Sequence, residues 1–326
     1  MKKPQVTIAI PTFNRADKFL GQALESAINQ TYQNLEILIS DNCSTDHTEE
    51  VVRSYSDPRI KYFRQKKNLG KQGNANFLLK MAKGDYFHLF HDDDHIEPDF
   101  VEVCMKRAKF KSGIGVIMSG SKMIDENGAA IQWEKNYFEG LSLEEFILNW
   151  YHCKVNVFLC CTLFGTKTLR EIGGFEEKYN LYDDVAANFK CTQVAGRLDI
   201  PEIKASLRSH SGSVTSSADL EAWSRDALAL LELACSLAPG KKKEIQKIGM
   251  QQSAKNVYMF ANERESRVER LKCSWKVFKT FGYRYPPPLK HCNQIIPISG
   301  YVLHPYKTIS KIKSTLLHSL RKAVTE

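Results

Sequence analysis

The first 120 residues show two alternating patterns of apolar and polar positions. Short continuous apolar runs, typical of buried β-strands, are each followed by a segment with the apolar spacing of an amphipathic helix. Strands alternating with helices in this way predict an α/β fold with a doubly wound, mostly parallel central sheet and helices on both faces. We expect the strands at residues 5–10, 35–40, 60–63, 85–90 and 114–119, and the helices at residues 17–29, 46–55, 72–82 and 98–109.

The pattern changes after Gly120. A hairpin is expected around Asn127-Gly128, and Ser142 with Glu145 forms the capping box of a further helix. The remaining expected elements are helices at residues 142–151, 167–172, 184–195, 218–237, 241–263 and 266–279, a strand at 157–164 and an extended segment at 205–208. We therefore expect one domain at residues 1–217, with halves 1–119 and 120–217, and a helical C-terminal region at 218–326.

Composition restricts the class of protein. The 326 residues are 43% hydrophobic and 25% charged, which is ordinary for a globular protein and excludes a wholly disordered or collagen-like chain. No apolar run is long enough to predict a membrane span, and the N-terminus does not resemble a signal peptide. The nine cysteines include no C-x-x-C pair, so we expect reduced thiols in a cytoplasmic protein rather than a disulfide framework or zinc cluster.

The net charge of +9 is unevenly distributed. Residues 240–326 carry 18 Lys and Arg against 5 Asp and Glu, so the basic C-terminal third accounts for more than the whole excess. Residues 307–322 place apolar side chains at helical spacing between cations, which fits either a solvated helical appendage or a helix lying on an anionic membrane. Nucleic-acid binding is disfavoured, because no segment combines aromatic and basic residues as such modules do.

Polar clusters follow three of the expected strands. They lie at residues 11–14, 41–46 and 92–94. Ligands of open α/β sheets bind beyond the carboxyl ends of the strands, so the fold itself would bring these clusters to one rim.

The run Asp92-Asp93-Asp94 suggests a metal site. A solvated acidic turn is the alternative, but the position directly after an apolar strand favours a function. Carboxylate oxygens suit Mg²⁺ or Mn²⁺ held together with substrate phosphates. His91 and His95 flank the run, and we expect both to be solvated neighbours rather than ligands.

Five segments together resemble family 2 of the glycosyltransferases. They are TIAIPTFNR at 7–15, SDNCSTDHT at 40–48, NLGKQGNAN at 68–76, the three aspartates, and GGFEEKYNLYDDVAANF at 173–189. The resemblance covers roughly residues 5–215. It implies a GT-A fold, a nucleotide-diphosphate sugar donor with a pyrimidine base, UDP or dTDP, a divalent metal, and transfer with inversion.

The resemblance also implies roles for single residues. Asp41 would accept a hydrogen bond from the pyrimidine ring, and Asp94 would bind the metal, with His210 as a second ligand. The residues expected around the nucleotide sugar are Pro11, Thr12, Asn14, Asp41, Asn68, Gly70, Asn76, Asp92 and Asp93. The family often has Arg before the last of the asparagines, where this chain has Ala75, and Lys71 is a candidate substitute.

Asp183 and Asp184 are the expected acceptor-side acids. The resemblance makes Asp184 the general base and Asp183 a contact to the acceptor, a glycan or lipid-linked hydroxyl used in polysaccharide or glycoconjugate synthesis. The alternative is an acidic cap at the start of a helix. An inverting transfer needs one base for the incoming hydroxyl and no covalent nucleophile.

Two other functions remain open. A catalytically idle sugar-nucleotide-binding or scaffold protein would share the same motifs. A sugar nucleotidyltransferase is disfavoured, because its Gly-rich phosphate loop is replaced here by PTFNR at 11–15. We expect a cytoplasmic location, with contact to the inner face of the membrane as a further hypothesis.

Overall fold

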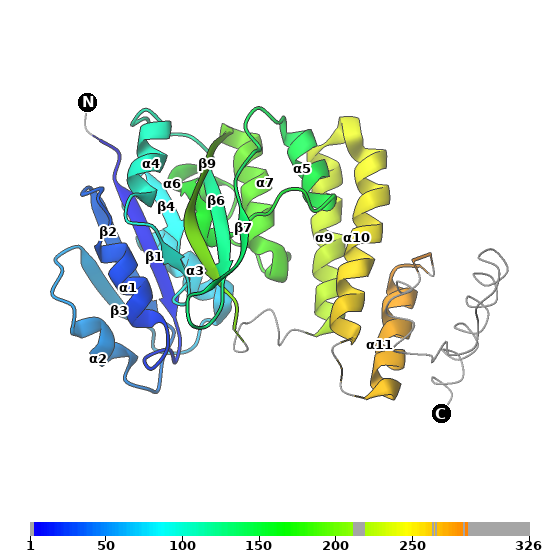
Figure 1. The fold of residues 1–326 in the computed structure, drawn as a ribbon, viewed down its shortest axis with the longest axis horizontal. Coiled ribbons are helices and arrows are strands. Elements are labelled where there is room, and N and C mark those ends of the chain that lie inside the picture. Colours follow the sequence, from blue (N-terminus) through cyan, green and yellow to red (C-terminus); the bar gives the residue numbers. More distant parts are fainter. Residues whose placement is uncertain (1–2, 211–218, 263, 265, 283, 286–326) are drawn as a thin grey trace.

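The protein is built on one mixed β-sheet (Figure 1). The computed structural model describes residues 3–210, 219–262, 264, 266–282 and 284–285, which contain a nine-stranded sheet. Its first four strands are parallel neighbours, whereas β8 pairs antiparallel with the strand on each side and β9 runs parallel to β6. The order is β3(Ile60–Arg64), β2(Leu35–Asp41), β1(Val6–Thr12), β4(Tyr86–Leu89), β8(Thr162–Gly165), β6(Val116–Ile124), β9(Arg197–Arg208) and β5(His95–Ile96), with β7(Ala130–Glu134) paired to β6.

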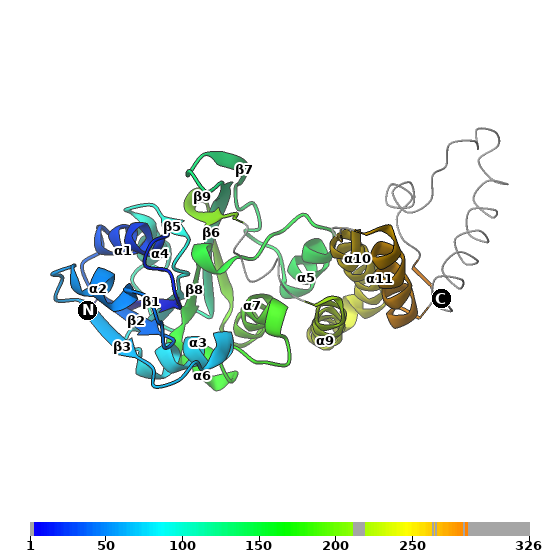
Figure 2. The same ribbon diagram turned by 90° about the horizontal axis from the view of Figure 1, so that it is seen from below.

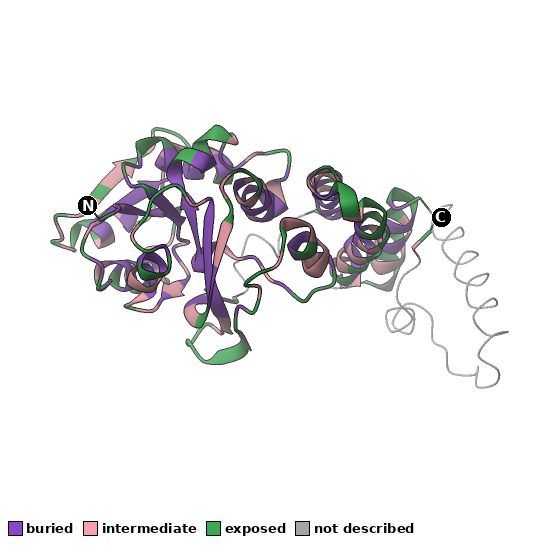
Figure 3. Cartoon of the chain, turned by 90° about the horizontal axis from the view of Figure 1, so that it is seen from above, coloured by how far each residue is buried: buried purple, intermediate pink, exposed green. Residues whose placement is uncertain are grey.

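Alternate residues of β1 belong to opposite faces of the sheet, as the period of a strand requires. Val6, Ile8 and Ile10 lie in one hydrophobic core, and Ala9 lies in the other. The first core contains α1(Leu20–Ile28), α2(Thr48–Arg53) and α4(Phe100–Arg107), and the second contains α3(Gly70–Met81), α5(Leu143–Tyr151), α6(Thr166–Glu171) and α7(Asp183–Ala195). The sheet therefore separates two helical layers (Figure 2), and its central strands are buried (Figure 3).

Three C-terminal helices extend the second layer away from the sheet. They are α9(Leu220–Leu237), α10(Lys242–Asn262) and α11(Arg267–Thr280), and they lie side by side beyond α5 and α7 (Figures 1 and 2). One core continues from Leu89 through Phe189 of α7 to Trp223 and Val257, so these helices pack directly on the sheet-bearing part. No described helix is both long and apolar enough to cross a membrane. The expected helix at 307–322 lies outside the described residues.

The strand register brings the polar clusters to one rim. Thr12 pairs with Asp41 across β1 and β2, and Ala9 pairs with Leu89 across β1 and β4. Asp92, three residues after Leu89, therefore comes level with Thr12 at the carboxyl end of the sheet. This confirms the placement expected from the sequence.

Most expected elements are present, with differences at their ends. The hairpin between β6 and β7 and the capping box at Ser142 are confirmed. The expected capping box at Asp46 is not formed, because Asp46 accepts hydrogen bonds from Thr48 and Glu49 pairs with arginines. Residues 159–161 form a 3₁₀ turn before β8, so the expected strand at 157–164 is shorter. β5 was not expected, and β9 begins eight residues earlier than the expected extended segment.

A glycine turn after α6 is tied to α3. The side-chain amide of Asn76 on α3 donates to the carbonyl of Phe175 and accepts from its N–H, at 2.8 and 2.9 Å. Gly174 has φ of +74°, and a Cβ at this position would collide with the Asn76 side chain. The turn thus depends on glycine for both conformation and close approach.

We expect Gly174→Ala to lower the free energy of unfolding by about 2–4 kcal/mol, because it adds backbone strain and a clash with Asn76. Urea unfolding measures the change. Gly140→Ala is the matched control: its φ is +83°, but no atom lies within 4 Å of the added Cβ. We expect this control to lose only about 1–2 kcal/mol; equal losses in both variants would contradict the close-approach argument.

Candidate active site

The loops after β1 and β2 are fastened to each other. The backbone N–H of Asn14 donates to the Ser44 hydroxyl at 2.9 Å, and the Asn14 side-chain oxygen accepts from the Thr45 N–H at 2.8 Å. Asn14 has φ of +53°, a conformation that asparagine tolerates better than most residues. These bonds hold Pro11, Thr12 and Asn14 beside residues 41–46.

Asp41 is fully buried at the end of β2. One carboxylate oxygen accepts from the Ser44 N–H at 2.7 Å, and the other accepts from the Tyr62 hydroxyl at 2.6 Å. Burial and this carboxylate raise the pKa of Tyr62 well above its ordinary value, so the phenol keeps its proton. The fixed carboxylate retains further lone pairs with which it could accept a base N–H.

Asn68 and Gly70 form the turn that starts α3. The Asn42 side chain donates to Asn68 and accepts from the N–H of Leu69, at 2.9 and 2.7 Å. Gly70 has φ of +73° and donates its N–H to the Asn68 side chain. Asn76 lies further along the helix, with its amide engaged by Phe175 as described above; its predicted contact with the nucleoside remains a prediction.

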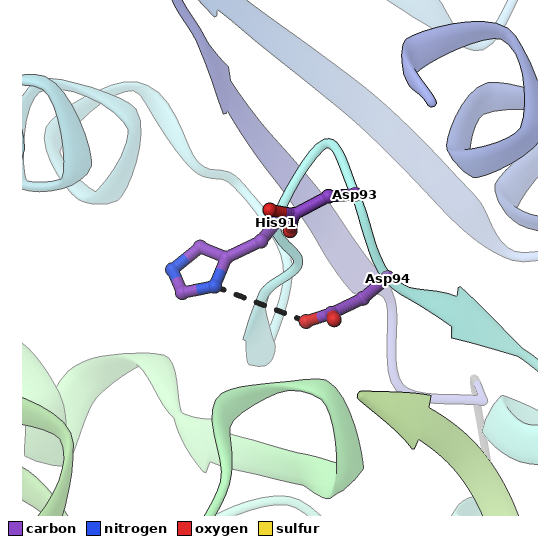
Figure 4. Close-up of side chains that lie close together, drawn as sticks. All are labelled: His91, Asp93 and Asp94. Atoms are coloured by element: carbon purple, nitrogen blue, oxygen red, sulfur yellow. Dashed lines mark ion pairs between the residues drawn. The ribbon is translucent and has the colours of Figure 1, made fainter. Parts of the chain in front are cut away.

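The turn after β4 gathers His91, Asp93 and Asp94 (Figure 4). One ligand atom from each of these three residues lies within 4.8 Å of the others. The Nδ1 of His91 is 3.8 Å from the Oδ2 of Asp94. We call these residues the His91–Asp94 cluster.

Asp94 has the chemistry of a metal ligand. Its side chain is 1% exposed; Oδ1 accepts from the N–H of Arg208 at 3.0 Å, whereas the buried Oδ2 has no hydrogen-bond partner among the described residues. An unpaired oxygen on a buried carboxyl group is costly unless a cation compensates it. The cluster therefore fits a divalent cation, with hard oxygens supplemented by one imidazole nitrogen.

The carboxyl groups of Asp92 and Asp94 hold their protons more strongly than free aspartate does. Burial, assisted by the charge of Asp93, raises the pKa of Asp92 to about 7, although the Thr12 hydroxyl and Arg15 act in the opposite direction. The same two causes raise the pKa of Asp94 well above its usual range. A bound cation would favour the ionised forms and offset this effect.

His210 and Arg208 support the turn from the end of β9. The Nε2 of His210 lies 2.9 Å from Oδ2 of Asp93, so this predicted ligand reaches the cluster through that carboxylate. The guanidinium of Arg208 donates to the carbonyl of Asp93 and to Gln22 of α1, both at 2.9 Å. Arg208 thus fixes the backbone of the aspartate turn at Asp93 and the side chain of Asp94.

Asp183 is buried at the start of α7, and both of its carboxylate oxygens have partners. Its Oδ1 pairs with the ammonium group of Lys71 at 2.9 Å, and its Oδ2 accepts from Gln72 at 2.9 Å. Lys71 and Gln72 both belong to α3, which begins at the Asn68–Gly70 turn. The Asp183 carboxylate therefore joins α3 to α7. The predicted contact between Asp183 and an acceptor remains a prediction.

Asp184 has fewer hydrogen-bond and ion-pair partners than Asp183 among the described residues. Its Oδ1 accepts only from the adjacent Val185 N–H among the hydrogen bonds of the described residues. Burial, followed by repulsion from Asp183, raises the pKa of Asp184 to about 7, and Lys71 partly opposes the rise. A carboxylate with a pKa near neutrality is well matched to general-base catalysis.

The acid pair and the His91–Asp94 cluster are near enough to influence each other electrostatically. The His91 imidazole lies within electrostatic range of Asp93, Lys71 and Asp183. Sequence reasoning missed His91 as a member of the cluster, and it did not find Arg208, Gln72 or Tyr62. The adjacency of His91 to the aspartate run was the available signal for the first; nothing in the sequence indicated the long-range contacts of the others.

Comparison with known proteins shows the family of the chain. Residues 7–165 match the family Glycosyl transferase family 2. The chain belongs to glycosyltransferase family 2. An uncharacterized glycosyltransferase of Rickettsia felis is 32% identical over 202 residues, which are 59% of this chain and 32% of that protein. The chain thus matches only about a third of the length of this relative.

Two solved structures share the fold. TarS of S. aureus (residues 1–349), in complex with UDP-GlcNAc, has a TM-score of 0.64 at 18% identity, covering 90% of this chain and 84% of that chain. A mannosyltransferase of Pyrobaculum calidifontis, in complex with GDP-Man and Mn²⁺, has a TM-score of 0.53 at 15% identity, covering 99% and 88%. At these identities the likeness establishes the GT-A-like fold, as the sequence motifs predicted.

The raised pKa of Asp184 predicts a pH-dependent effect on stability. The folded value of about 7 exceeds the ordinary value of about 4, so ionisation of Asp184 costs stability as pH rises between them. In chelator at pH 8, we expect Asp184→Asn to raise the free energy of unfolding by about 1–3 kcal/mol. The gain should shrink below pH 7 and vanish near pH 4.

Urea unfolding across this pH range checks the effect. Asp183→Asn is the contrasting variant, and we expect it to destabilise the protein at pH 8 because it breaks the pair with Lys71. A gain from Asp184→Asn that is the same at pH 4 and pH 8 would rule out ionisation as its cause.

Proposed function

We propose that the chain is a metal-dependent inverting glycosyltransferase, which moves a sugar from a nucleoside-diphosphate donor to a hydroxyl of a glycan or lipid-linked acceptor. The observation that carries the proposal is the pairing of two sites on one rim. The buried Asp94 offers an unpaired oxygen beside His91, and Asp184 offers a carboxyl with a pKa near 7. Ligands in the two fold neighbours, UDP-GlcNAc in TarS and GDP-Man with Mn²⁺ in the mannosyltransferase, agree with such a site.

The nucleotide end of the donor would lie against the loops after β1 and β2. Asp41, already oriented by Ser44 and Tyr62, would accept the ring N–H of a pyrimidine such as that of UDP or dTDP. Pro11, Thr12 and Asn14 would form the opposite wall, with Asn68 and Gly70 at the start of α3. Asp92 lies beside Arg15, whose Nε is 4.0 Å from its carboxylate, and would contact the ribose or the donor sugar.

Asp94, Asp93 and His91 would hold Mn²⁺ or Mg²⁺, and His210 remains a predicted ligand that contacts Asp93. When bound, such an ion supplies Lewis-acid stabilisation to the leaving diphosphate. Arg208 keeps the Asp94 carboxylate aimed by donating its backbone N–H to Oδ1, which leaves Oδ2 as the free oxygen. The protein thereby orients the ligand atoms before the donor arrives.

Asp184 would remove the proton from the acceptor hydroxyl as that oxygen attacks the anomeric carbon. Asp183 would hold the start of α7 in place through Lys71 and Gln72, and its charge would keep the pKa of Asp184 high. Two adjacent carboxyl groups would therefore divide the work, one as the base and one as the positioning group. A cytoplasmic reaction with peripheral membrane contact stays a prediction that depends on the basic tail.

The metal site is tested by Asp94→Asn, which keeps the bond from Arg208 but removes the charge of the candidate ligand. We expect Mn²⁺ affinity, measured by calorimetry, to fall at least about tenfold, since loss of even an outer partner commonly costs that much. Release of nucleoside diphosphate from a panel of sugar nucleotides should fall with it. Glu232→Gln, an exposed change on α9, is the control; undiminished Mn²⁺ binding by Asp94→Asn would remove the residue from the metal site.

The base is tested by Asp184→Asn in the same donor panel. General-base catalysis contributes about 10²–10⁴-fold, so turnover should fall by that factor while donor and Mn²⁺ affinity are kept. Wild-type kcat/KM should rise with pH to a plateau above about pH 7, because only the ionised carboxylate accepts a proton. If Asp184→Asn retains most of the turnover, the base is another group.

A further inference from the structure

A cavity of about 120 Å³ lies where α5 and the start of α7 meet α9 and α10. It is separate from the His91–Asp94 cluster, and no residue of the nucleotide-side loops lines it. Its principal side chains are Trp150 and Tyr151 of α5, Tyr182 of the 3₁₀ turn η2(Asn180–Tyr182), and Gln252, Ser253 and Asn256 of α10.

Tyr151 lines this cavity and carries an unsatisfied group. The residue is 2% exposed, and its hydroxyl has no hydrogen-bond partner among the described residues. Its ring packs against α10, where a Cβ on Gly249 would lie 3.1 Å from the ring. An unpaired buried hydroxyl is costly, so the site favours a ligand or solvent molecule that can bond to it.

The chemistry of the lining selects the class of ligand. None of the side chains that line the cavity is charged, which disfavours a phosphate or a carboxylate. Trp150 is half-buried, and its described ring neighbours Tyr151, Tyr182 and Phe189 all meet it at 84–90°, so none of them stacks parallel to it. Aromatic surface combined with amide and hydroxyl groups suits a neutral ligand that has both C–H faces and hydroxyls, which is the chemistry of a sugar ring.

The size suits one face of a single ring. One water occupies about 30 Å³ in the liquid, so the cavity has room for about four waters. Cys153 is an exposed member of the lining and gives the cavity contact with solvent.

A line of polar side chains connects the cavity to the acceptor side of the site. Gln252 donates its amide to Asn256 at 2.8 Å, and Asn256 lies near enough to the Tyr182 hydroxyl to oppose the rise that burial causes in the pKa of Tyr182. Tyr182 is followed directly by Asp183 and Asp184, so its Cα is within about 8 Å of the Cα of the proposed base. The cavity wall and the base are therefore parts of one short segment.

We infer that this cavity binds an uncharged sugar ring of the acceptor, and that α10 supplies part of the acceptor site. The inference rests on the proposed function for its role in transfer. It extends that function in two ways: it makes the acceptor a saccharide at this position, and it gives the C-terminal helices a direct part in recognition.

The test uses the full chain without donor, and methyl glycosides of glucose, galactose, N-acetylglucosamine and N-acetylgalactosamine as probes in saturation-transfer NMR. We expect at least one glycoside to bind. Tyr151→Phe and Gln252→Ala should each raise its Kd roughly three- to tenfold, the effect of one lost hydrogen bond. Gln251→Ala, an exposed change beside Gln252, should have no effect. Binding of no glycoside, or equal affinities in all variants, would overturn the inference.

A second readout protects the test from misfolding and separates it from the proposed function. Saturating glycoside should slow alkylation of Cys153 but not of Cys43, which lies in the loop after β2; unchanged alkylation of Cys153 would also overturn the inference. Calorimetry of UDP with Mn²⁺ is run on the same proteins, and both cavity variants should retain this binding. If the wild-type protein binds a glycoside but not UDP, the proposed function is refuted and a saccharide site remains. If it binds UDP but no glycoside, only the inference about the cavity is refuted.

Discussion

A buried carboxyl group with one satisfied and one free oxygen is the constraint around which this rim is arranged. Asp94 can be held in that state only if something fixes Oδ1 and excludes water from Oδ2, and the backbone N–H of Arg208 does the first. Arg208 is the last residue of β9, a strand of 12 residues that follows β6 across two register shifts. The length and placement of β9 thus determine where the candidate metal ligand points.

Satisfied and unsatisfied carboxyl groups also lie side by side at the start of α7. Adjacent carboxylates repel each other, and a fold can accommodate them by pairing one and leaving the other able to hold a proton. Lys71 and Gln72 pair with Asp183 and stabilise its charge. Ionisation of Asp184 is then unfavourable, and its pKa rises to about 7. Placing a helix N-terminus at this point limits the cost, because the aligned N–H groups favour negative charge.

Local pattern was sufficient to predict the parallel half of the sheet and its polar rim. The strands that carry the site are continuous apolar runs that each end in a polar cluster. The register of parallel neighbouring strands then brings these clusters to one rim. The motifs likewise identified Asp41, Asp94 and Asp184 as candidate residues. The two-residue β5 and the first part of β9 were missed, because their pairing comes from contacts between residues far apart in the sequence, about 110 positions for β5 and about 80 for the first part of β9. His91 was set aside for a different, local reason: it is only three residues from Asp94, but the separation of their side chains depends on how the turn closes.

The C-terminal helices show how stability and recognition can share one set of contacts. Trp223 of α9 meets the Tyr182 ring at 5.5 Å and stacks on Phe260 of α10, so the aromatic core of the helical region continues to the segment before Asp184. Asn256 of α10 adds a polar neighbour, which opposes the rise that burial causes in the pKa of Tyr182. The position of Tyr182, and with it the start of α7, is therefore set from both sides, by α3 through Asp183 and by the C-terminal helices through Tyr182. A change in the packing of α10 would shift Tyr182 and, two residues further along the backbone, the proposed base Asp184. The His91–Asp94 cluster is held by β9 and would keep its position.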